Sequence, residues 1–219
     1  MSSEKVRLGD ICKVINGGNW TSNEYAESGI PVVRVSDMKN GTVDVSDLKH
    51  LEESEYERYK KHELHEGDLV LATVGSHKTS SSAAGRATII PRYVDGMLLN
   101  QNAACLRTDS DKLDQKYLCY LGQSPEYQSY LQTMGKGAAN QMRIALSSIR
   151  DYEFTLPSIQ EQKQIAGILS AFDNLIEVNR QRIEQLERAA RLLYREWFVH
   201  HRFPGHEHTE IVDGVPEGW

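Results

Sequence analysis

Apolar side chains in the last third of the chain recur with a strict spacing. From Ile165 to Trp197 they alternate in steps of four and three residues, with one polar member, Asn179. This is the heptad spacing of a coiled coil, because an average step of about 3.5 residues keeps one stripe of a helix turned toward a partner helix. The predicted stripe, called the seam below, contains Ile165, Leu169, Phe172, Ile176, Asn179, Ile183, Leu186, Ala190, Leu193 and Trp197.

The helix that carries the seam has recognisable ends. Ser158 and Glu161 form an S-x-x-E capping box, and Pro204-Gly205 ends the helix on the other side. A helix over about residues 158–200 is roughly 60 Å long at about 1.5 Å per residue. A domain of this size cannot enclose such a helix. We therefore expect it to project and to form an antiparallel coiled coil with a partner.

Three positions modify this expectation. Asn179 is expected to lower the stability of the coiled coil but to fix its register and pairing. Ile168 and Leu175 lie beside the seam, so the first half of the helix is expected to bury a wider face. An ordinary amphipathic helix packed on the domain's own core is the alternative, which the strict spacing disfavours.

The residues before the helix alternate between short apolar runs and turn-forming residues, which is typical of a strand-rich domain. The expected fold class is α+β, with a globular domain over 1–156, the long helix over 157–203 and a polar, linker-like tail over 204–219. Strands are predicted at 6–15, 30–35, 42–45, 69–74, 86–90, 97–107 and 154–156, and helices at 54–62, 114–121 and 125–134.

Composition excludes several classes of protein. Of the 219 residues, 39% are hydrophobic and 26% are charged, as in folded soluble proteins. The sequence has no run of about 20 apolar residues, which a membrane-spanning helix needs, and no leading signal peptide. Its 3 widely spaced cysteines predict neither a disulfide framework nor a metal site. We expect a cytoplasmic protein.

The net charge of −6 is unevenly distributed. Residues 1–150 carry 18 Lys and Arg against 19 Asp and Glu, a net of −1, whereas residues 151–219 carry 7 against 12, a net of −5. This distribution excludes a uniformly basic nucleic-acid-binding protein. It allows a local basic face on a nearly neutral domain.

Four short motifs lie in order along the chain: Leu8-Gly-Asp-Ile11, Glu66-Gly-Asp-Leu-Val70, Leu156-Pro-Ser-Ile-Gln-Glu-Gln162 and Pro216-Glu-Gly-Trp219. With the heptad helix that follows the third motif, they resemble the specificity (S) subunit of type I restriction–modification enzymes. A full S subunit has two target recognition domains and two spacer helices packed antiparallel, whereas this chain has one of each. The resemblance therefore implies a half-length form, natural or truncated, that pairs with a second copy through the helix.

The resemblance also implies recognition without catalysis on this chain. In that family, methyltransferase (M) subunits bind S-adenosylmethionine and methylate adenine, and a restriction (R) subunit cleaves the DNA. This chain is expected to need no cofactor of its own and, as a homodimer, to read an interrupted palindrome in double-stranded DNA. Because its net charge opposes phosphate binding, we expect weak, salt-sensitive DNA binding by the chain alone and tighter binding in complex.

Candidate DNA contacts are chosen by chemistry, because Lys, Arg, Ser and Thr bind phosphates while Arg, Lys, Asn and Gln read base edges. Each of these residues also has an interpretation without DNA. The two polar loops could be ordinary solvated surface. Trp20 could be a packing lid, and Arg34 could belong to an ion pair. Asn100 to Asn102, in a predicted strand, are expected to be buried and hydrogen-bonded. The predicted DNA-binding residues are Lys78, Thr79, Ser80, Ser81 and Arg86 in the first loop, Lys136, Asn140, Gln141 and Arg143 in the second, and Trp20, Thr21 and Arg34 elsewhere.

Two other functions remain open from the sequence. One is a coiled-coil interaction protein that binds no nucleic acid, and the other is a hydrolase that uses the histidines. His200, His201, His206 and His208 lie near the tail but straddle Pro204-Gly205. Because a metal site needs ligands in fixed geometry, we predict no metal here.

Overall fold

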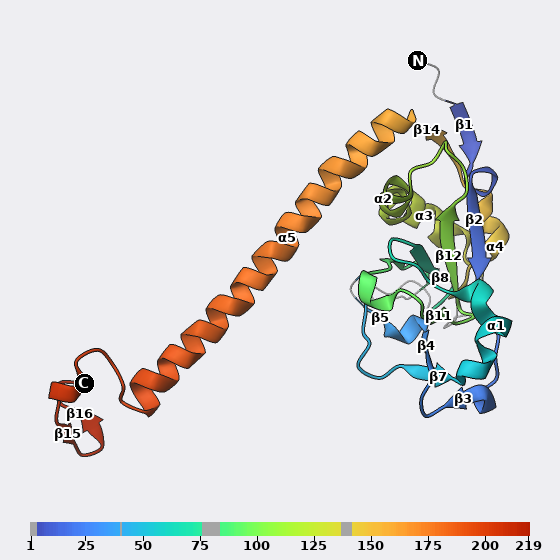
Figure 1. Cartoon of the computed structure of the whole chain (residues 1–219). Helices are drawn as coiled ribbons and strands as arrows, with labels where there is room; N and C mark the ends of the chain where they lie inside the picture. The colour runs from blue at the N-terminus through green and yellow to red at the C-terminus, as the bar shows by residue number, and fades with distance from the viewer. Residues whose placement is uncertain (1–3, 40, 76–83, 137–141) are drawn as a thin grey trace. The chain divides into compact units, whose positions relative to one another are not determined.

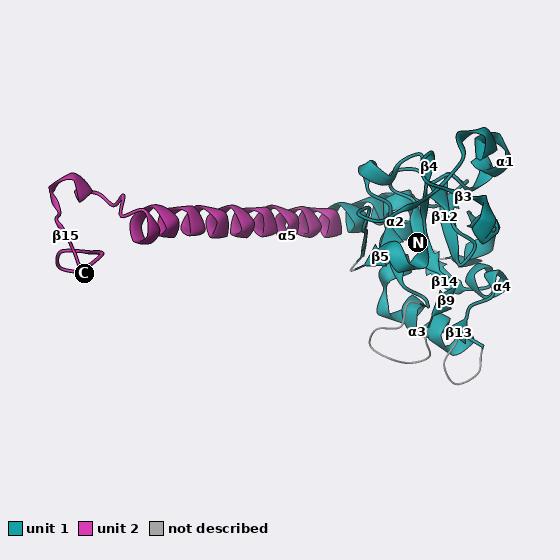
Figure 2. Ribbon diagram, turned by 90° about the horizontal axis from the view of Figure 1, so that it is seen from below, with its two compact units in different colours: residues 1–167 teal, residues 168–219 magenta. Residues whose placement is uncertain are grey.

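The computed structural model describes residues 4–39, 41–75, 84–136 and 142–219. The chain divides into two compact units, Met1–Gly167 (unit 1) and Ile168–Trp219 (unit 2), as coloured in Figure 2. The division falls inside the helix α5 (Ile159–Tyr194), so its first turns belong to unit 1. Mixed helix and strand followed by one long helix is the expected α+β class, which is confirmed (Figure 1).

Two four-stranded sheets build unit 1 (Figure 1). The central sheet is antiparallel, with the order β10 (Ala87–Ile89), β8 (Leu69–Ala72), β12 (Ala103–Thr108), β2 (Cys12–Asn16). The second sheet has the order β11 (Leu98–Leu99), β4 (Ile30–Val33), β7 (Lys49–Leu51), β3 (Tyr25–Ala26), with β11 parallel to β4.

Smaller elements complete the described chain. The two-stranded pairs are β1 (Glu4–Arg7) with β14 (Glu153–Leu156), β9 (Val74–Gly75) with β13 (Met142–Arg143), β5 (Met38–Lys39) with β6 (Thr42–Val43), and β15 (Ile211–Val212) with β16 (Val215–Pro216). The helices of unit 1 before α5 are α1 (Tyr56–Tyr59), α2 (Gln115–Gln123), α3 (Pro125–Met134) and α4 (Leu146–Arg150).

The central sheet is buried on both faces, which explains why β8 is a continuous apolar run rather than an alternating one. Successive side chains of a strand point to opposite faces. One face packs against α2, α3 and α4 and the other against residues of β4, β5 and β11. The first face presents Leu69, Leu71, Ala104 and Leu106, and the second presents Val70, Ala72, Ala103 and Cys105.

Four predicted elements are interrupted in the structure. The strand predicted at 6–15 breaks into β1 and β2 at a 3₁₀ turn, Leu8–Asp10. Leu8 is fully buried there, and a Cβ on Gly9 would lie 2.7 Å from the Cβ of Arg150, so α4 packs too closely for any larger residue. Packing against a distant helix therefore breaks the strand.

The strand predicted at 69–74 divides into β8 and β9 at Thr73. Two further elements are also interrupted. The strand predicted at 97–107 divides into β11 and β12 at a turn, in which Asn100 is buried as expected but Gln101 is exposed. The helix predicted at 54–62 shrinks to α1 between two 3₁₀ turns. Its Tyr59 is buried against Trp20 rather than lying on a surface helix.

The start of α5 agrees with the predicted capping box. The Ser158 backbone N–H donates to Glu161 Oε2 at 2.8 Å, and the Glu161 N–H donates to Ser158 Oγ at 3.4 Å. The α-helix has 36 residues, about 54 Å at about 1.5 Å per residue, and continues as a π-helical turn, Arg195–Val199. The predicted long helix is confirmed.

The tail does not have the linker-like structure that its polar composition predicts. Within unit 2 it forms the hairpin β15–β16. The ring of Trp219 lies 4.9 Å from that of Phe198 and 4.8 Å from that of Phe203. The sequence reasoning was wrong here because these aromatic residues, spread along the chain, gather only after the turn at Pro204.

Gly17 gives a test of the packing in unit 1. A Cβ at this position would overlap the backbone carbonyl of Asn100. Gly17→Ala is therefore expected to lower the free energy of unfolding by about 1–3 kcal/mol, because backbone atoms must move. Gly167, in α5, has open space around it. Gly167→Ala should instead stabilise by about 0.5–1 kcal/mol. Urea unfolding measures both, and equal stabilities for the two variants would contradict the packing described.

Candidate nucleic-acid interface

The two polar loops predicted to contact DNA arise from the same small sheet. Strands β9 and β13 pair antiparallel, with Gly75 opposite Met142 and Val74 opposite Arg143 (Figure 2). Lys136 and Arg143 exchange backbone hydrogen bonds of 3.0 and 2.9 Å. Residues 76–83 follow β9 and residues 137–141 precede β13, so the two loops begin side by side although the sequence separates them widely.

Six predicted contact residues lie in these loops, outside the described residues. They are Lys78, Thr79, Ser80, Ser81, Asn140 and Gln141. Their predicted DNA contacts therefore stay predictions. The structure shows the strands β9 and β13, which flank the two loops.

The paired strands are held to the core. The Ile144 N–H donates to the Thr73 carbonyl at 2.8 Å, and Met142 is 2% exposed. The side chains of Lys136 and Arg143 are exposed, and neither forms an ion pair with any residue that the structure describes. Two strands that are hydrogen-bonded to each other and to the core thus carry two exposed cations at the start of the polar loops, which suits binding to phosphates or base edges.

The side chain of Arg86 is more buried than the polar loop before it suggested. It is half-buried, and its Nη1 donates to the backbone carbonyl of Met38 at 2.6 Å. The side chain thereby links the segment before β10 to β5. A structural role for Arg86 is visible, while its predicted DNA contact remains untested.

The structure favours the packing alternative for Trp20. The indole is 5% exposed, and its ring meets that of Tyr59 edge to face at 5.1 Å. A side chain buried this way cannot reach DNA without opening the core, so its predicted contact is not available in this structure. The hydrophobic pattern could not distinguish the two roles, because a lone Trp in a polar loop suits both.

Thr21, next in the chain, is exposed but has a local partner. Its backbone N–H and Oγ1 donate to Glu24 Oε2 at 2.6 and 2.9 Å, and they cap a 3₁₀ turn. Hydrogen bonds from the Thr21 backbone, the Tyr59 hydroxyl and the Thr21 hydroxyl lower the pKa of Glu24 to about 2. The threonine therefore orders this loop whether or not it contacts DNA.

For Arg34 the structure shows the ion pair that the sequence left open. Its Nε and Nη2 donate to the carboxylate of Asp37 at 2.9 and 2.8 Å, and Nη2 also donates to the Asp47 carbonyl at 3.0 Å. The hydrogen bond to Asp37 raises the pKa of Arg34. The Nε–Nη2 edge of the guanidinium, one of the two edges that could read a guanine, is occupied by Asp37.

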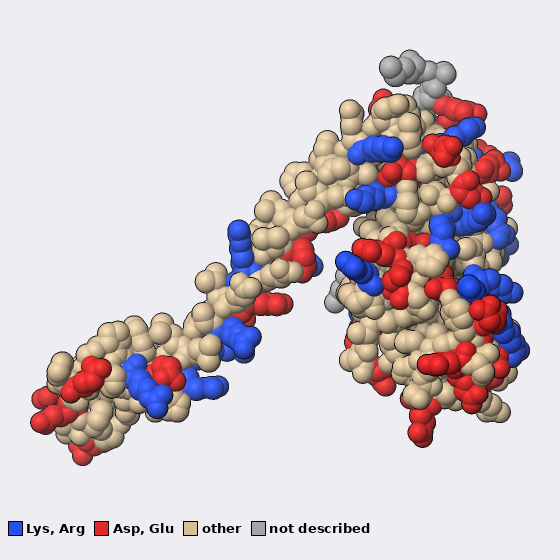
Figure 3. Space-filling view, viewed as in Figure 1, with Lys and Arg blue, Asp and Glu red and all other residues tan. Residues whose placement is uncertain are grey.

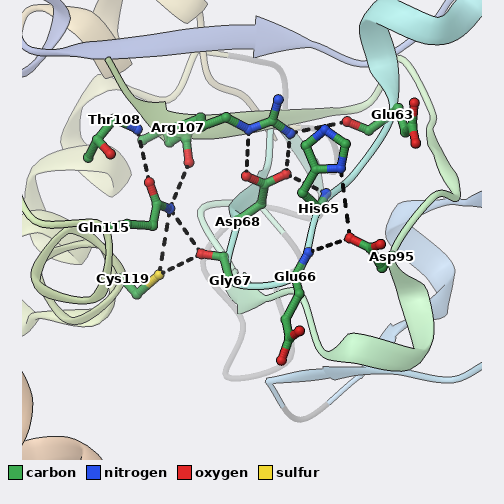
Figure 4. A network of polar contacts seen from close by, with 11 residues as sticks. Glu63, His65, Glu66, Gly67, Asp68, Asp95, Arg107, Thr108, Gln115 and Cys119 are labelled. Atoms are coloured by element: carbon green, nitrogen blue, oxygen red, sulfur yellow. Dashed lines mark hydrogen bonds and ion pairs between the residues drawn. The ribbon is translucent and has the colours of Figure 1, made fainter. Parts of the chain in front are cut away.

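A buried polar network surrounds the Glu66-Gly-Asp motif (Figure 4). Asp68 is 3% exposed and accepts from Arg107 Nε at 2.8 Å, from Arg107 Nη2, and from the His65 backbone N–H at 2.7 Å. Arg107 Nη2 also donates to the Glu63 carbonyl at 3.2 Å. The motif thus joins the start of β8 to β12, a scaffold role that sequence reasoning missed because Arg107 is distant in the chain.

The same network extends to α2. Gln115 Nε2 donates to the Gly67 carbonyl at 2.9 Å, and its Oε1 accepts from the Thr108 N–H at 2.9 Å (Figure 4). Cys119 Sγ donates to the same Gly67 carbonyl at 3.4 Å, and burial raises the pKa of this thiol to about 12. A thiol with so high a pKa is unreactive near neutral pH, so Cys119 belongs to the scaffold.

The seam residues within unit 2 are largely exposed along α5. Exposed fractions are 60% for Phe172 and 69% for Leu186. A second apolar stripe lies next to the seam, because at about 100° per residue these positions fall on its neighbouring face. This second stripe contains Ile168, Ala171, Leu175 and Val178, which are all exposed. Arg182 and Gln185 interrupt it before the exposed Leu192, which lies on the same face. The opposite face carries Asp173, Asn174, Glu177, Arg180, Gln181, Glu184 and Arg188.

Charge is mixed on the face of unit 1 that Figure 3 shows. On the face shown in Figure 3, acidic and basic side chains are interspersed, and the described residues in that view form no continuous basic face. No set of three or more His, Cys, Asp or Glu residues in the described part of the chain is arranged to hold a metal ion. None of the described helices is both long and apolar enough to cross a membrane.

Comparison with known proteins places these features in a family context. The family model described as "Type I restriction modification DNA specificity domain" matches residues 2–188. A putative type I restriction enzyme MjaX specificity subunit of Methanocaldococcus jannaschii is 30% identical over 216 residues, covering 97% of this chain and 49% of the relative. The MjaVIII specificity subunit of the same organism is 26% identical over 186 residues, or 85% of this chain and 43% of the relative.

Solved structures agree on the fold. The S subunit of a type I restriction–modification system from M. genitalium superposes with a TM-score of 0.60 at 17% identity, covering 94% of this chain and 48% of that structure. The chain thus spans about half the length of the relatives that it matches.

Proposed function

The chain belongs to the type I restriction modification DNA specificity family, and from this premise we propose that it is a sequence-specific recognition subunit for double-stranded DNA. In this role it is non-catalytic and positions adenine-methyltransferase (M) subunits, and a restriction (R) subunit where one is present, over the site. S-adenosylmethionine is then bound by the M subunit. The observation that carries the proposal is the family match over residues 2–188, which spans unit 1 and most of the seam.

Within this role, the two loops based on β9 and β13 are the proposed DNA-reading elements. Their bases lie side by side and carry the exposed cations Lys136 and Arg143. Phosphate contacts orient a protein on the duplex, while base-edge contacts specify the sequence. Because the two loops follow and precede paired strands of one small sheet, we propose that they supply both kinds of contact to neighbouring base pairs.

Arg143→Ala and Lys136→Ala test the loop assignment. Each is expected to weaken duplex binding by about 1 kcal/mol or more and to reduce the slope of log K against log salt by about 1, because one phosphate contact is lost. Fluorescence anisotropy at several salt concentrations, on the native complex with genomic duplex fragments, measures both quantities. Lys116→Ala, on an exposed lysine of α2, is the matched control, and the same loss in all three variants would contradict the assignment.

The helix α5 is proposed to pair with its counterpart in a second copy. Its residues 159–178 carry 1 Lys against 3 acidic residues, a net of −2, and its continuation over 179–199 carries 5 Arg against 3 Glu, a net of +2. Antiparallel pairing places the acidic half of each helix along the basic half of the other, whereas parallel pairing would align like charges. The charge pattern therefore supports an antiparallel dimer reading an interrupted palindrome.

The second apolar stripe is proposed as the docking surface for an M subunit. A two-helix coiled coil buries mainly its seam positions. Ile168, Leu175 and Leu192 lie outside the seam and are 61, 54 and 52% exposed. Apolar side chains repeated along a helix face mark an interaction site. The identity of the partner comes from the family role, and the pull-down below tests it.

Purification of the tagged chain from its native cell tests the proposed function. We expect a methyltransferase to co-purify and the complex to transfer methyl groups from S-adenosylmethionine to duplex DNA. The chain alone should bind DNA weakly, because its net charge of −6 opposes phosphate binding. Finding neither a methyltransferase nor DNA binding would favour a coiled-coil interaction protein instead.

A further inference from the structure

Gln162, in the first turns of α5, is the one side chain of the Pro157–Gln162 motif that is completely buried, at 0% exposed. Its carboxamide oxygen accepts from the Asp114 backbone N–H at 2.9 Å. Its carboxamide nitrogen donates to the carbonyls of Lys112 and Pro157, both at 2.8 Å. One amide therefore joins the start of α5 to the segment before α2 and to Pro157, the residue that follows β14.

This arrangement is unlike that of the neighbouring glutamines. Gln160 and Gln164, in the same stretch of helix, are exposed. Burial of an amide costs about 1–3 kcal/mol unless its hydrogen bonds are formed inside the protein, and here three are formed. Asp114 also caps α2, because its Oδ1 accepts from the Tyr117 N–H at 3.0 Å. Gln162 thus locks the start of α5 to the start of α2.

Beyond this point α5 has little further attachment in unit 1. Ala166, one turn later, is 2% exposed, but Ile165 is 39% exposed. Gln162 and Ala166 are the two buried residues of the whole helix. Gln162 and Ala166 are thus the residues through which the start of the helix is buried in unit 1, and Gln162 adds three hydrogen bonds to residues of that unit.

We propose that Gln162 is a positioning residue that restricts the dimer to one gap length between its two DNA half-sites. The inference rests on the proposed function, since it requires two copies paired through α5. One additional base pair in the gap increases the separation of the half-sites by about 3.4 Å and rotates them relative to each other about the DNA axis by about 35°. A firmly held helix start resists both changes, whereas a loosened start lets each recognition unit shift to follow the DNA.

Selection of bound duplexes from a pool with a random segment, followed by sequencing, tests this inference on the native complex. Wild-type protein is expected to enrich one bipartite motif with one gap length. Gln162→Ala should enrich the same half-sites, but the preference for that gap over gaps one base pair longer or shorter should fall about tenfold, as expected when buried hydrogen bonds are lost. Gln162→Met keeps the length and burial of the side chain, removes the hydrogen bonds, and decides the question if Gln162→Ala does not fold.

The outcomes separate the inference from the function on which it rests. Gln164→Ala, at an exposed glutamine of the same helix, should keep the wild-type gap. A folded Gln162→Met protein with the wild-type gap preference would overturn the positioning role. Failure of the wild-type complex to enrich any motif would instead overturn the proposed function. Weaker binding at an unchanged gap would show a merely structural residue, which also contradicts the inference.

Discussion

Replacement of Leu186 by aspartate is expected to separate the dimer into monomers while unit 1 stays folded. Leu186 is 69% exposed in the single chain and lies in the middle of the basic half of the seam. Pairing would bury it against the second copy, so the variant loses apolar burial and places an unpaired carboxylate in an apolar interface. We expect a loss of about 4 kcal/mol, which raises the dissociation constant of the dimer about a thousandfold.

Sedimentation equilibrium over a range of concentrations measures this change. Asn174→Asp is the matched control, because Asn174 is an exposed residue on the polar face of the same helix. It adds the same charge without touching the seam and should leave the dimer intact. A Leu186→Asp protein that dimerises as tightly as wild type would show that the seam does not form the interface.

Arg107→Ala is expected to cause a large loss of stability in unit 1, about 3 kcal/mol in the free energy of unfolding, which is the lower end for a buried pair because the Arg107 side chain is 31% exposed. The substitution leaves the carboxylate of Asp68, which is 3% exposed, without its charged partner. The donors that remain, among them the His65 backbone N–H at 2.7 Å, are uncharged. Removal of one member of a buried pair costs more than the pair contributes, because the other charge stays buried.

The exposed ion pair between Arg7 and Glu153 is the control for the pair between Arg107 and Asp68. Arg7 Nε lies 3.2 Å from Glu153 Oε1, but these side chains are 59 and 48% exposed. Arg7→Ala should therefore cost no more than about 1 kcal/mol. Urea unfolding followed by circular dichroism measures both variants, and equal losses would mean that the Asp68–Arg107 pair is no more important than a surface contact.

Local signals made the long helix predictable from sequence. The seam repeats within each heptad, and the cap at Ser158 depends on Glu161, three residues away. Such patterns depend only on residues that are close in sequence, so they predict the helix regardless of how the rest of the chain folds. The same reasoning was correct for α3, whose bounds match the predicted 125–134, because Ser124 caps it and Pro125 begins it.

Features that depend on distant contacts were missed. The strand predicted at 6–15 breaks at Gly9 because Arg150 packs against it from the far end of the domain. The tail forms a hairpin because Trp219 packs on Phe198 and Phe203. Polar composition is typical of linkers, but it carries no information about such aromatic contacts.

In the candidate site, too, the features set by local sequence were predictable, and those set by distant contacts were not. Loop composition alone identified both polar loops, but their common base depends on the pairing of β9 with β13. The motifs around Asp68 and Gln162 identified the family, while their structural roles depend on Arg107 and Asp114, which are 39 and 48 residues away in sequence. Trp20 and Arg34 had two chemically reasonable roles each, and only burial and hydrogen-bond partners distinguish them.

The most direct test of the proposed role is to sequence the native genome for methylated adenine with and without the gene for this chain. Methylation is expected to disappear at one interrupted, palindromic site and to return when the wild-type chain is restored. With Leu186→Asp it should not return. Methylation that is unchanged when the gene is deleted would contradict the conclusion that this chain directs a methyltransferase to its DNA site.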